Sequence, residues 1–120
     1  MVGVRGETEE CFEDYLSFVK GLDVSQLHVF TYSERARTRM VEMDLPIVLP
    51  AERKRRSDIL HEVSANKLQA FYAANKGRTV TVLWESKNSK GKMAGFTENY
   101  IRVTASYEPQ KVNTFETRTL

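Results

Sequence analysis

The sequence has 120 residues, of which 41% are hydrophobic and 28% are charged, as in soluble globular proteins rather than disordered ones. This length allows one ordinary domain, or one small domain joined to part of another. No apolar run approaches the ~20 residues of a membrane-spanning helix, the N-terminus lacks the pattern of a secretory signal, and the single cysteine excludes an internal disulfide. These features predict a reduced cytoplasmic protein without membrane contact.

Charge is distributed unevenly along the chain, although the net charge is only +2. Residues 1–50 contain 5 Lys and Arg against 9 Asp and Glu, whereas residues 51–120 contain 13 against 7. A basic half is typical of proteins that bind a polyanion. A soluble protein with a basic surface and no such ligand would give the same balance, so charge alone leaves both interpretations open.

The first half begins with a strand–helix–strand pattern. An apolar segment at residues 1–4 precedes Thr8, a suitable N-cap for a helix with two acids in its first turn. Apolar residues then recur at helical spacing up to Gly21, which suits the end of a helix, and residues 26–32 resemble a second strand. Such strands are normally parallel and adjacent. Two strands and one helix cannot cover both faces of a sheet, so we expect either the rest of a larger α/β sheet or self-association through the incomplete one.

One long helix and several short strands are predicted for residues 50–120. Residues 33–50 look irregular, and Pro50 suits the first position of a helix that continues to about Lys76, with Gly77 at its end. Val80, Val82 and Trp84 alternate as one face of a strand, and further strands are predicted at residues 93–97, 100–105 and 112–120. This spacing predicts a small antiparallel barrel or open sheet.

Side chains for metal or nucleophilic chemistry are few. One cysteine and two distant histidines, His28 and His61, do not form a zinc or iron–sulfur ligand set. We expect a structural role for His28 because it lies in a predicted strand. Cys11 lies in a predicted helix beside Phe12, so we expect an unreactive core thiol.

Four consecutive cations occupy residues 53–56, in the first turns of the long predicted helix. The helix dipole opposes each exposed cation there by ~0.3–1 kcal/mol, and i,i+4 pairs with neighbouring acids offset only part of this at ~0.2–0.5 kcal/mol each. The run therefore indicates an external anion, and we take Arg53, Arg55 and Arg56 as candidate RNA contacts on a solvated helix face. A solvated face without a ligand is the alternative.

Other cations mark the ends and turns of the predicted strands, namely Lys76, Arg78, Lys87, Lys90, Lys92 and Arg102. Phe96 and Tyr100 lie close to them and are candidates for stacking on RNA bases. Tyr100 and Arg102 occupy alternate positions of one predicted strand, so we expect them to face the same side. The alternative is that both aromatic residues are half-buried parts of the sheet.

Three segments resemble, in the same order, motifs of the tRNA methylthiotransferases. Residues 2–10 are similar to V-G-x-x-G-E-T-E-E, residues 27–35 to L-H-V-F-x-Y-S-x-R, and residues 95–103 to G-x-T-E-N-Y-x-R-V, the core of the RNA-binding TRAM domain. The match is closest to the subgroup that acts on threonylcarbamoyl-adenosine. Arg37 departs from the pattern because the family has glycine there, so we expect a different loop geometry.

The resemblance implies an α/β plus β fold. Residues 1–49 would be the end of a radical-SAM α/β barrel, residues 50–77 a linking helix, and residues 78–120 an antiparallel TRAM-type β-barrel that docks tRNA and lacks an edge strand. The parent enzyme would place a methylthio group on the modified adenosine beside the anticodon. A stand-alone RNA-binding or RNA-chaperone module, and a scaffold whose basic face meets another protein, are the alternatives.

The resemblance also implies cofactors for the parent enzyme. The family uses [4Fe-4S] clusters, held by cysteines that this sequence lacks, and S-adenosylmethionine. We therefore expect the chain to bind no cluster, to be non-catalytic by itself, and to depend on the remainder of the parent enzyme. Gly3, Gly6, Glu7 and Tyr32 are the residues that the resemblance places near S-adenosylmethionine.

Overall fold

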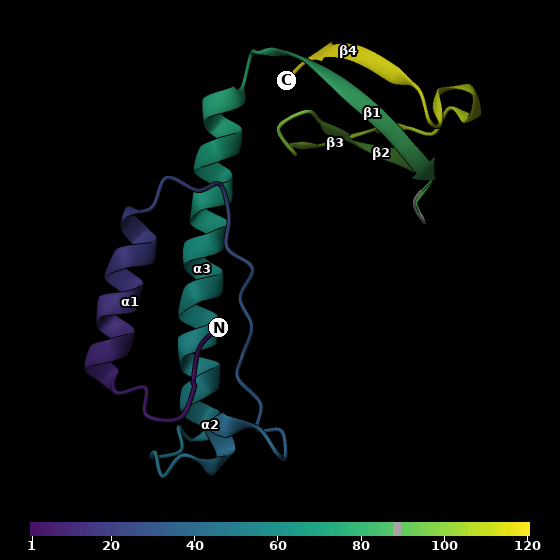
Figure 1. Cartoon of the computed structure of the whole chain (residues 1–120). Helices are drawn as coiled ribbons and strands as arrows, with labels where there is room; N and C mark the ends of the chain where they lie inside the picture. Colours follow the sequence, from purple (N-terminus) through teal and green to yellow (C-terminus); the bar gives the residue numbers. More distant parts are fainter. Residues whose placement is uncertain (88–89) are drawn as a thin grey trace. The chain divides into compact units, whose positions relative to one another are not determined.

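The computed structural model describes residues 1–87 and 90–120, with the backbone alone for residues 86 and 87. The chain divides into two compact units, Met1–Phe71 and Tyr72–Leu120. Helix α3, Pro50–Asn75, is the long teal helix in Figure 1, and it supplies residues to both units. Its start confirms the prediction that Pro50 opens a helix.

Helix α1, Glu9–Gly21, has the predicted bounds. The Thr8 hydroxyl accepts a hydrogen bond from the Cys11 N–H at 3.1 Å, and acids in the first turn with a lysine in the last complement the helix dipole. Phe12 is 1% exposed, whereas Cys11 is exposed. The prediction of a core thiol is wrong because adjacent helical residues differ by about 100° in direction, which turns Cys11 outward when Phe12 faces the core.

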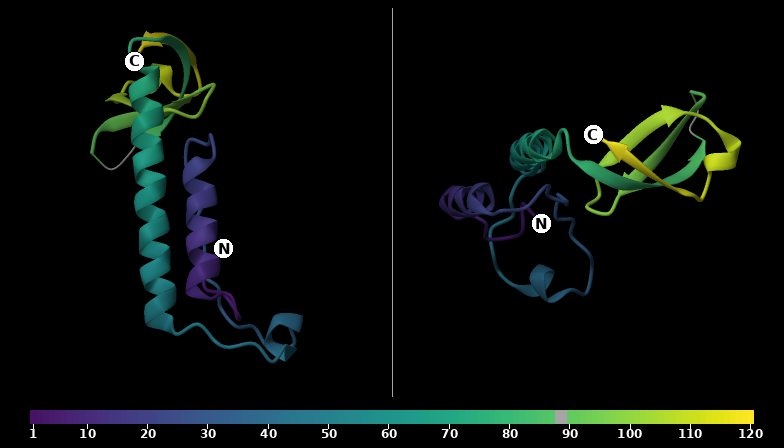
Figure 2. Two further views of the ribbon diagram at one scale, coloured as in Figure 1. Left: turned by 90° about the vertical axis from the view of Figure 1, so that its left-hand side faces the viewer. Right: turned by 90° about the horizontal axis from the view of Figure 1, so that it is seen from above.

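In the first unit, α1 lies alongside the first part of α3 and runs in the same direction (Figures 1 and 2). The buried residues Val2, Phe12, Val19 and Leu60 form the core. Burial of these apolar side chains holds the two helices and the N-terminal segment together at ~25 cal/mol per Å² removed from water.

The two predicted parallel strands are reduced to one bridge between Val2 and Thr31. The Val2 N–H donates to the Phe30 carbonyl, and the Tyr32 N–H donates to the Val2 carbonyl, both at 2.9 Å. The predicted parallel direction is confirmed, and the predicted strand length is wrong. A short helix, α2 (Arg39–Glu42), lies in the segment predicted to be irregular.

The second unit is a curled four-stranded antiparallel sheet, which Figure 2 shows from above. Its strands are β1 (Thr79–Lys87), β2 (Lys92–Thr97), β3 (Arg102–Ser106) and β4 (Phe115–Thr119), in the order β3-β2-β1-β4. A 3-10 turn, Pro109–Lys111, connects β3 to β4. The sheet confirms the prediction of a small antiparallel β unit.

The inner face of the sheet carries the core of the second unit. Val80, Val82, Trp84 and Met93 are buried there, which confirms the predicted alternation of β1. The Trp84 indole N–H donates to the Glu116 carboxylate at 2.6 Å. That bond satisfies the polar atom of a side chain that is 0% exposed.

Gly95 in β2 is required by close backbone packing. It is the register partner of Trp84 and of Val103. A Cβ atom at this position would collide with the Leu83 carbonyl oxygen and would lie 2.7 Å from Val82 Cγ1. Glycine is the residue that permits this approach of β2 to β1.

Candidate nucleic-acid interface

The T-E-N-Y segment forms the connection between β2 and β3, and Thr97 is its anchor. Thr97 is 4% exposed, and its hydroxyl accepts from the Ile101 N–H at 2.9 Å. Its carbonyl accepts from the Tyr100 N–H at 3.0 Å. The Glu98 carboxylate accepts from the Thr81 N–H at 3.0 Å. These bonds give the loop a fixed geometry.

The last turn of α3 holds the same connection. Asn75 is 3% exposed, and its side-chain oxygen accepts from Asn99 Nδ2 at 3.1 Å and from the Arg78 guanidinium at 3.0 Å. The Tyr72 hydroxyl accepts from the Arg102 N–H at 3.1 Å. Arg78 remains exposed, so this candidate RNA contact is oriented by Asn75 and still accessible.

Tyr100 presents its ring to solvent, with 80% of the residue exposed. Its φ is 65°, which is unusual for a residue other than glycine. Because β3 begins at Arg102, the prediction that Tyr100 and Arg102 alternate along one strand is wrong. The Tyr100 ring instead lies against Phe96, with the ring centroids 6.3 Å apart and the planes tilted by 53°.

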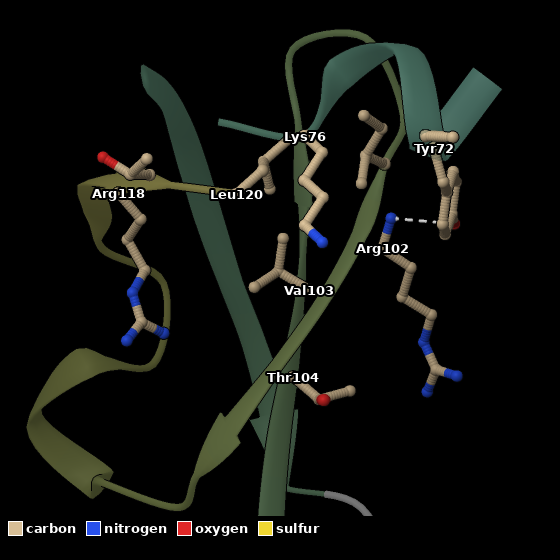
Figure 3. A pocket seen from close by; sticks show the side chains of 10 residues that line it. Tyr72, Lys76, Arg102, Val103, Thr104, Arg118 and Leu120 are labelled. Atoms are coloured by element: carbon tan, nitrogen blue, oxygen red, sulfur yellow. Dashed lines mark hydrogen bonds between the residues drawn. The ribbon is translucent and has the colours of Figure 1, made fainter. Parts of the chain in front are cut away.

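Lys76 and Arg102 line a hollow of about 540 Å³ beside the open edges of the sheet, β3 and β4 (Figure 3). Arg118 of β4 also lines it, and in Figure 3 Lys76 lies between the two arginines. Arg118 was not among the predicted contacts, although it falls in the last predicted strand. The Arg118 guanidinium lies 5.6 Å from the Trp84 ring centroid.

The other predicted contacts of the second unit occupy its turns. Lys90 and Lys92 are exposed around the β1–β2 connection. The side chain of Lys87, the remaining candidate, lies outside the described residues. The accessible candidates in this unit are therefore Lys76, Arg78, Lys90, Lys92, Phe96, Tyr100 and Arg102, with Phe96 only half-exposed.

The cation run of α3 differs from the prediction of a solvated face. Arg53 is 7% exposed and Arg56 is 4% exposed. The Arg53 guanidinium donates to the Tyr32 carbonyl at 3.1 Å and to the Glu34 carboxylate at 2.9 Å, and this contact lowers the pKa of Glu34. Internal acids thus offset the dipole penalty, and both arginines are left out of the proposed RNA surface.

Arg55 is the member of the predicted trio that stays accessible. Its side chain is 45% exposed, and its guanidinium pairs with Glu9 at 2.6 Å. It also donates to the Glu52 carboxylate at 2.9 Å, and this hydrogen bond lowers the pKa of Glu52 to about 2. The acids of α1 and α3 therefore already neutralise Arg55.

The residues that the family resemblance places near S-adenosylmethionine serve internal contacts. Both Glu7 oxygens accept from the Gly3 N–H at 3.1 Å, and one also accepts from Arg56 at 2.7 Å. A Cβ on Gly3 would lie 2.5 Å from Arg53 Cγ, so a side chain already fills the space that glycine leaves.

Gly6 and Tyr32 complete that set. The Gly6 N–H donates to the Pro46 carbonyl at 2.8 Å. The Tyr32 hydroxyl is buried without a hydrogen-bond partner among the described residues. The N–H groups of Gly3 and Gly6 and the Glu7 carboxylate are thus engaged inside the unit, and contact of this set with S-adenosylmethionine stays a prediction.

Metal and membrane features are limited within the described part of the chain. No three His, Cys, Asp or Glu residues there are grouped as metal ligands. Among the same residues, no helix combines the length and the apolar character needed to cross a bilayer.

Comparison with known proteins identifies relatives of one kind. The chain is 37% identical to tRNA-2-methylthio-N(6)-dimethylallyladenosine synthase of Bacillus velezensis, over 82% of its length. It is 34% identical to threonylcarbamoyladenosine tRNA methylthiotransferase MtaB of Aquifex aeolicus, over 86% of its length. A Desulfitobacterium hafniense synthase of the first type is 33% identical over 95% of the chain. No family model matches the chain.

The chain spans about a fifth to a quarter of the length of these relatives: 19%, 24% and 26%, respectively. The matches confirm the resemblance stated from the three sequence motifs. The chain is homologous to one segment of the tRNA methylthiotransferases.

Proposed function

We propose, from this homology, that the chain is the tRNA-docking part of a methylthiotransferase that modifies the adenosine beside the anticodon. The observation that carries the proposal is the Thr97–Tyr100 connection, whose internal hydrogen bonds hold the exposed Tyr100 ring against Phe96, the register partner of the exposed Arg102. Single-strand-binding proteins combine aromatic platforms with basic grooves in this way.

The proposal assigns chemistry to the remainder of the parent enzyme. Radical-SAM chemistry, which the family resemblance implies, would use clusters and S-adenosylmethionine bound elsewhere in that enzyme. The chain described here would contribute RNA affinity and position, and the reaction would take place in the cytoplasm, where tRNA is modified.

Phosphate groups are the expected main ligands of the basic side chains. Lys76 and Arg102 lie at one hollow with Arg118, and Arg78 is oriented by Asn75. Residues 72–120 hold 8 Lys and Arg against 4 Asp and Glu, so the unit as a whole attracts a polyanion. Such contacts release counterions, which makes the affinity fall as salt concentration rises.

The test is a tRNA gel-shift series at several salt concentrations with the full 120-residue chain. The Lys76→Ala/Arg102→Ala double variant should bind more weakly, and its plot of log affinity against log salt should lose about 1.5 in slope for two lost phosphate contacts. The matched control is Lys20→Ala/Lys54→Ala, which removes two exposed cations from the first unit and should bind like the wild type. Absence of tRNA binding, or an unchanged slope in the double variant, would contradict the proposal.

A further inference from the structure

One row of side chains crosses the outer face of the sheet, with one residue from each strand. Leu83 of β1 is the register partner of Phe115 in β4 and of Phe96 in β2. Phe96 is in turn the register partner of Arg102 in β3. Directly opposed residues of antiparallel strands lie on the same face. From β4 to β3 the row therefore consists of Phe115, Leu83, Phe96 and Arg102.

The row faces solvent rather than the core. Leu83 is 39% exposed, although Val82 and Trp84 on either side of it are 0% exposed, which fixes the direction of β1. Phe115 is 74% exposed. Leu83, Phe96 and Phe115 line a hollow of about 380 Å³ together with Tyr100, whose ring lies against Phe96.

We propose that this row is a stacking platform for unpaired RNA bases, with Phe96 and Phe115 as two separate stacking sites. Neighbouring strands are about 4.8 Å apart, so two rings separated by one strand are about 10 Å apart, with Leu83 as an apolar floor between them. Arg102 ends the row, where it would bind the phosphate of the same RNA strand. The inference rests on the proposed function and adds the class of RNA site, unpaired bases, that the sheet recognises.

The charges around the hollow favour bases over phosphate groups and acidic peptides as occupants. Two carboxylates, Glu85 and Glu98, line it, and carboxylates repel phosphate and acidic peptides. They accept hydrogen bonds from exocyclic amino groups of bases, as in the pairing of Glu with cytosine N4. The bases would therefore enter the hollow while the phosphates lie toward Arg102. Bases inside a duplex present no free face, so the platform requires unpaired RNA.

The test uses a single-stranded RNA octamer containing 2-aminopurine, whose fluorescence is quenched when the base stacks on a ring. Phe115→Leu keeps apolar bulk and removes the ring. It should lower octamer affinity about 5- to 150-fold, which corresponds to one lost stacking contact, and should reduce the quenching to the part that Phe96 supplies. Phe115→Tyr should retain both. Phe18→Ala, which removes a ring 64% exposed on the first unit, is the matched control and should behave like the wild type.

The results of this test distinguish the stacking platform from tRNA docking as a whole. If Phe115→Leu binds and quenches like the wild type, the platform is refuted while tRNA docking stands. Binding of tRNA with no binding of the octamer refutes the platform alone, and failure of the wild type to bind either RNA refutes both proposals. If the wild type is a dimer in sedimentation and Phe115→Leu is a monomer, the row is an interface between two chains and the proposal is overturned. Thermal melts followed through Trp84 fluorescence identify any variant that is unfolded, and Phe115→Tyr then decides by its quenching.

Discussion

The Arg56 guanidinium donates to the Glu7 carboxylate at 2.7 Å, across 49 residues of sequence. The two side chains are 5% and 12% exposed, and Arg56 also donates to the Glu7 carbonyl at 2.9 Å. The N-terminal loop is therefore attached to α3 through a desolvated ion pair as well as through the apolar core. Removing Glu7 leaves the nearly buried Arg56 cation with Glu9 and Glu52 as its remaining ionic partners, at 3.0 and 2.9 Å.

Glu7→Ala should accordingly lower the free energy of unfolding by about 1–3 kcal/mol, because the Gly3 N–H and the Arg56 guanidinium lose a part-buried acceptor. Urea unfolding followed by far-ultraviolet circular dichroism measures this change. The control is Asp58→Ala, which breaks the exposed Lys54–Asp58 pair and should cost less than about 1 kcal/mol. Equal effects of the two substitutions would contradict a structural role for the buried pair.

Stability of the first unit should depend on pH through Glu52. Its hydrogen bond from Arg55 lowers the pKa from 4.5 to about 2. A carboxylate with a lowered folded-state pKa stabilises the fold above pH 4.5, and that contribution is lost as the pH falls from 4.5 towards 2. Urea midpoints at several pH values should fall in this window, and Glu52→Gln should flatten the decline. Glu62→Gln removes an exposed carboxylate of α3 and should leave the decline in place.

The sheet should not tolerate a side chain at Gly95. Gly95→Ala places a methyl group against the Leu83 carbonyl, which belongs to rigid backbone, and overpacking of this kind costs about 1–3 kcal/mol. Unfolding followed by Trp84 fluorescence measures the loss. Ser106→Ala changes an exposed residue of β3 and should be near neutral. A Gly95→Ala variant as stable as the wild type would show that β2 can move away from β1 at no cost.

Cys11 should react readily in the folded protein because its side chain is exposed. A thiol-specific chromogenic reagent should modify one thiol per chain at a rate close to that of the urea-unfolded chain. Strong protection in the native state would mean that another surface covers Cys11 in solution.

Local signals predicted the elements well. The Thr8 cap and Gly21 set the ends of α1, and Pro50 set the start of α3. The strict alternation of Val80, Val82 and Trp84 identified the inner face of β1. Each of these features depends on neighbours within a few residues, which is the range that a sequence pattern reports.

Ion pairs and strand registers between residues far apart in the sequence could not be predicted from the sequence pattern. Arg53 pairs with Glu34, 19 residues away, and Arg56 pairs with Glu7, 49 residues away, so the run looked like a solvated basic face. Phe115 was missed for a similar reason, since its place beside Leu83 follows from the register between β1 and β4. The position of Tyr100 depended on its positive φ, which no residue type other than glycine signals clearly.

The contacts of Tyr72 and Asn75 have a practical consequence for grafting the sheet onto another protein. Both side chains come from the last turns of α3 and accept hydrogen bonds from the Asn99–Arg102 stretch. A transplanted segment that started at Arg78 would lose both acceptors, and only the internal bonds of Thr97 and Glu98 would then hold the loop that displays Tyr100. A segment that started before Tyr72 would keep both hydrogen bonds, so the smallest segment suitable for grafting includes the last turns of α3.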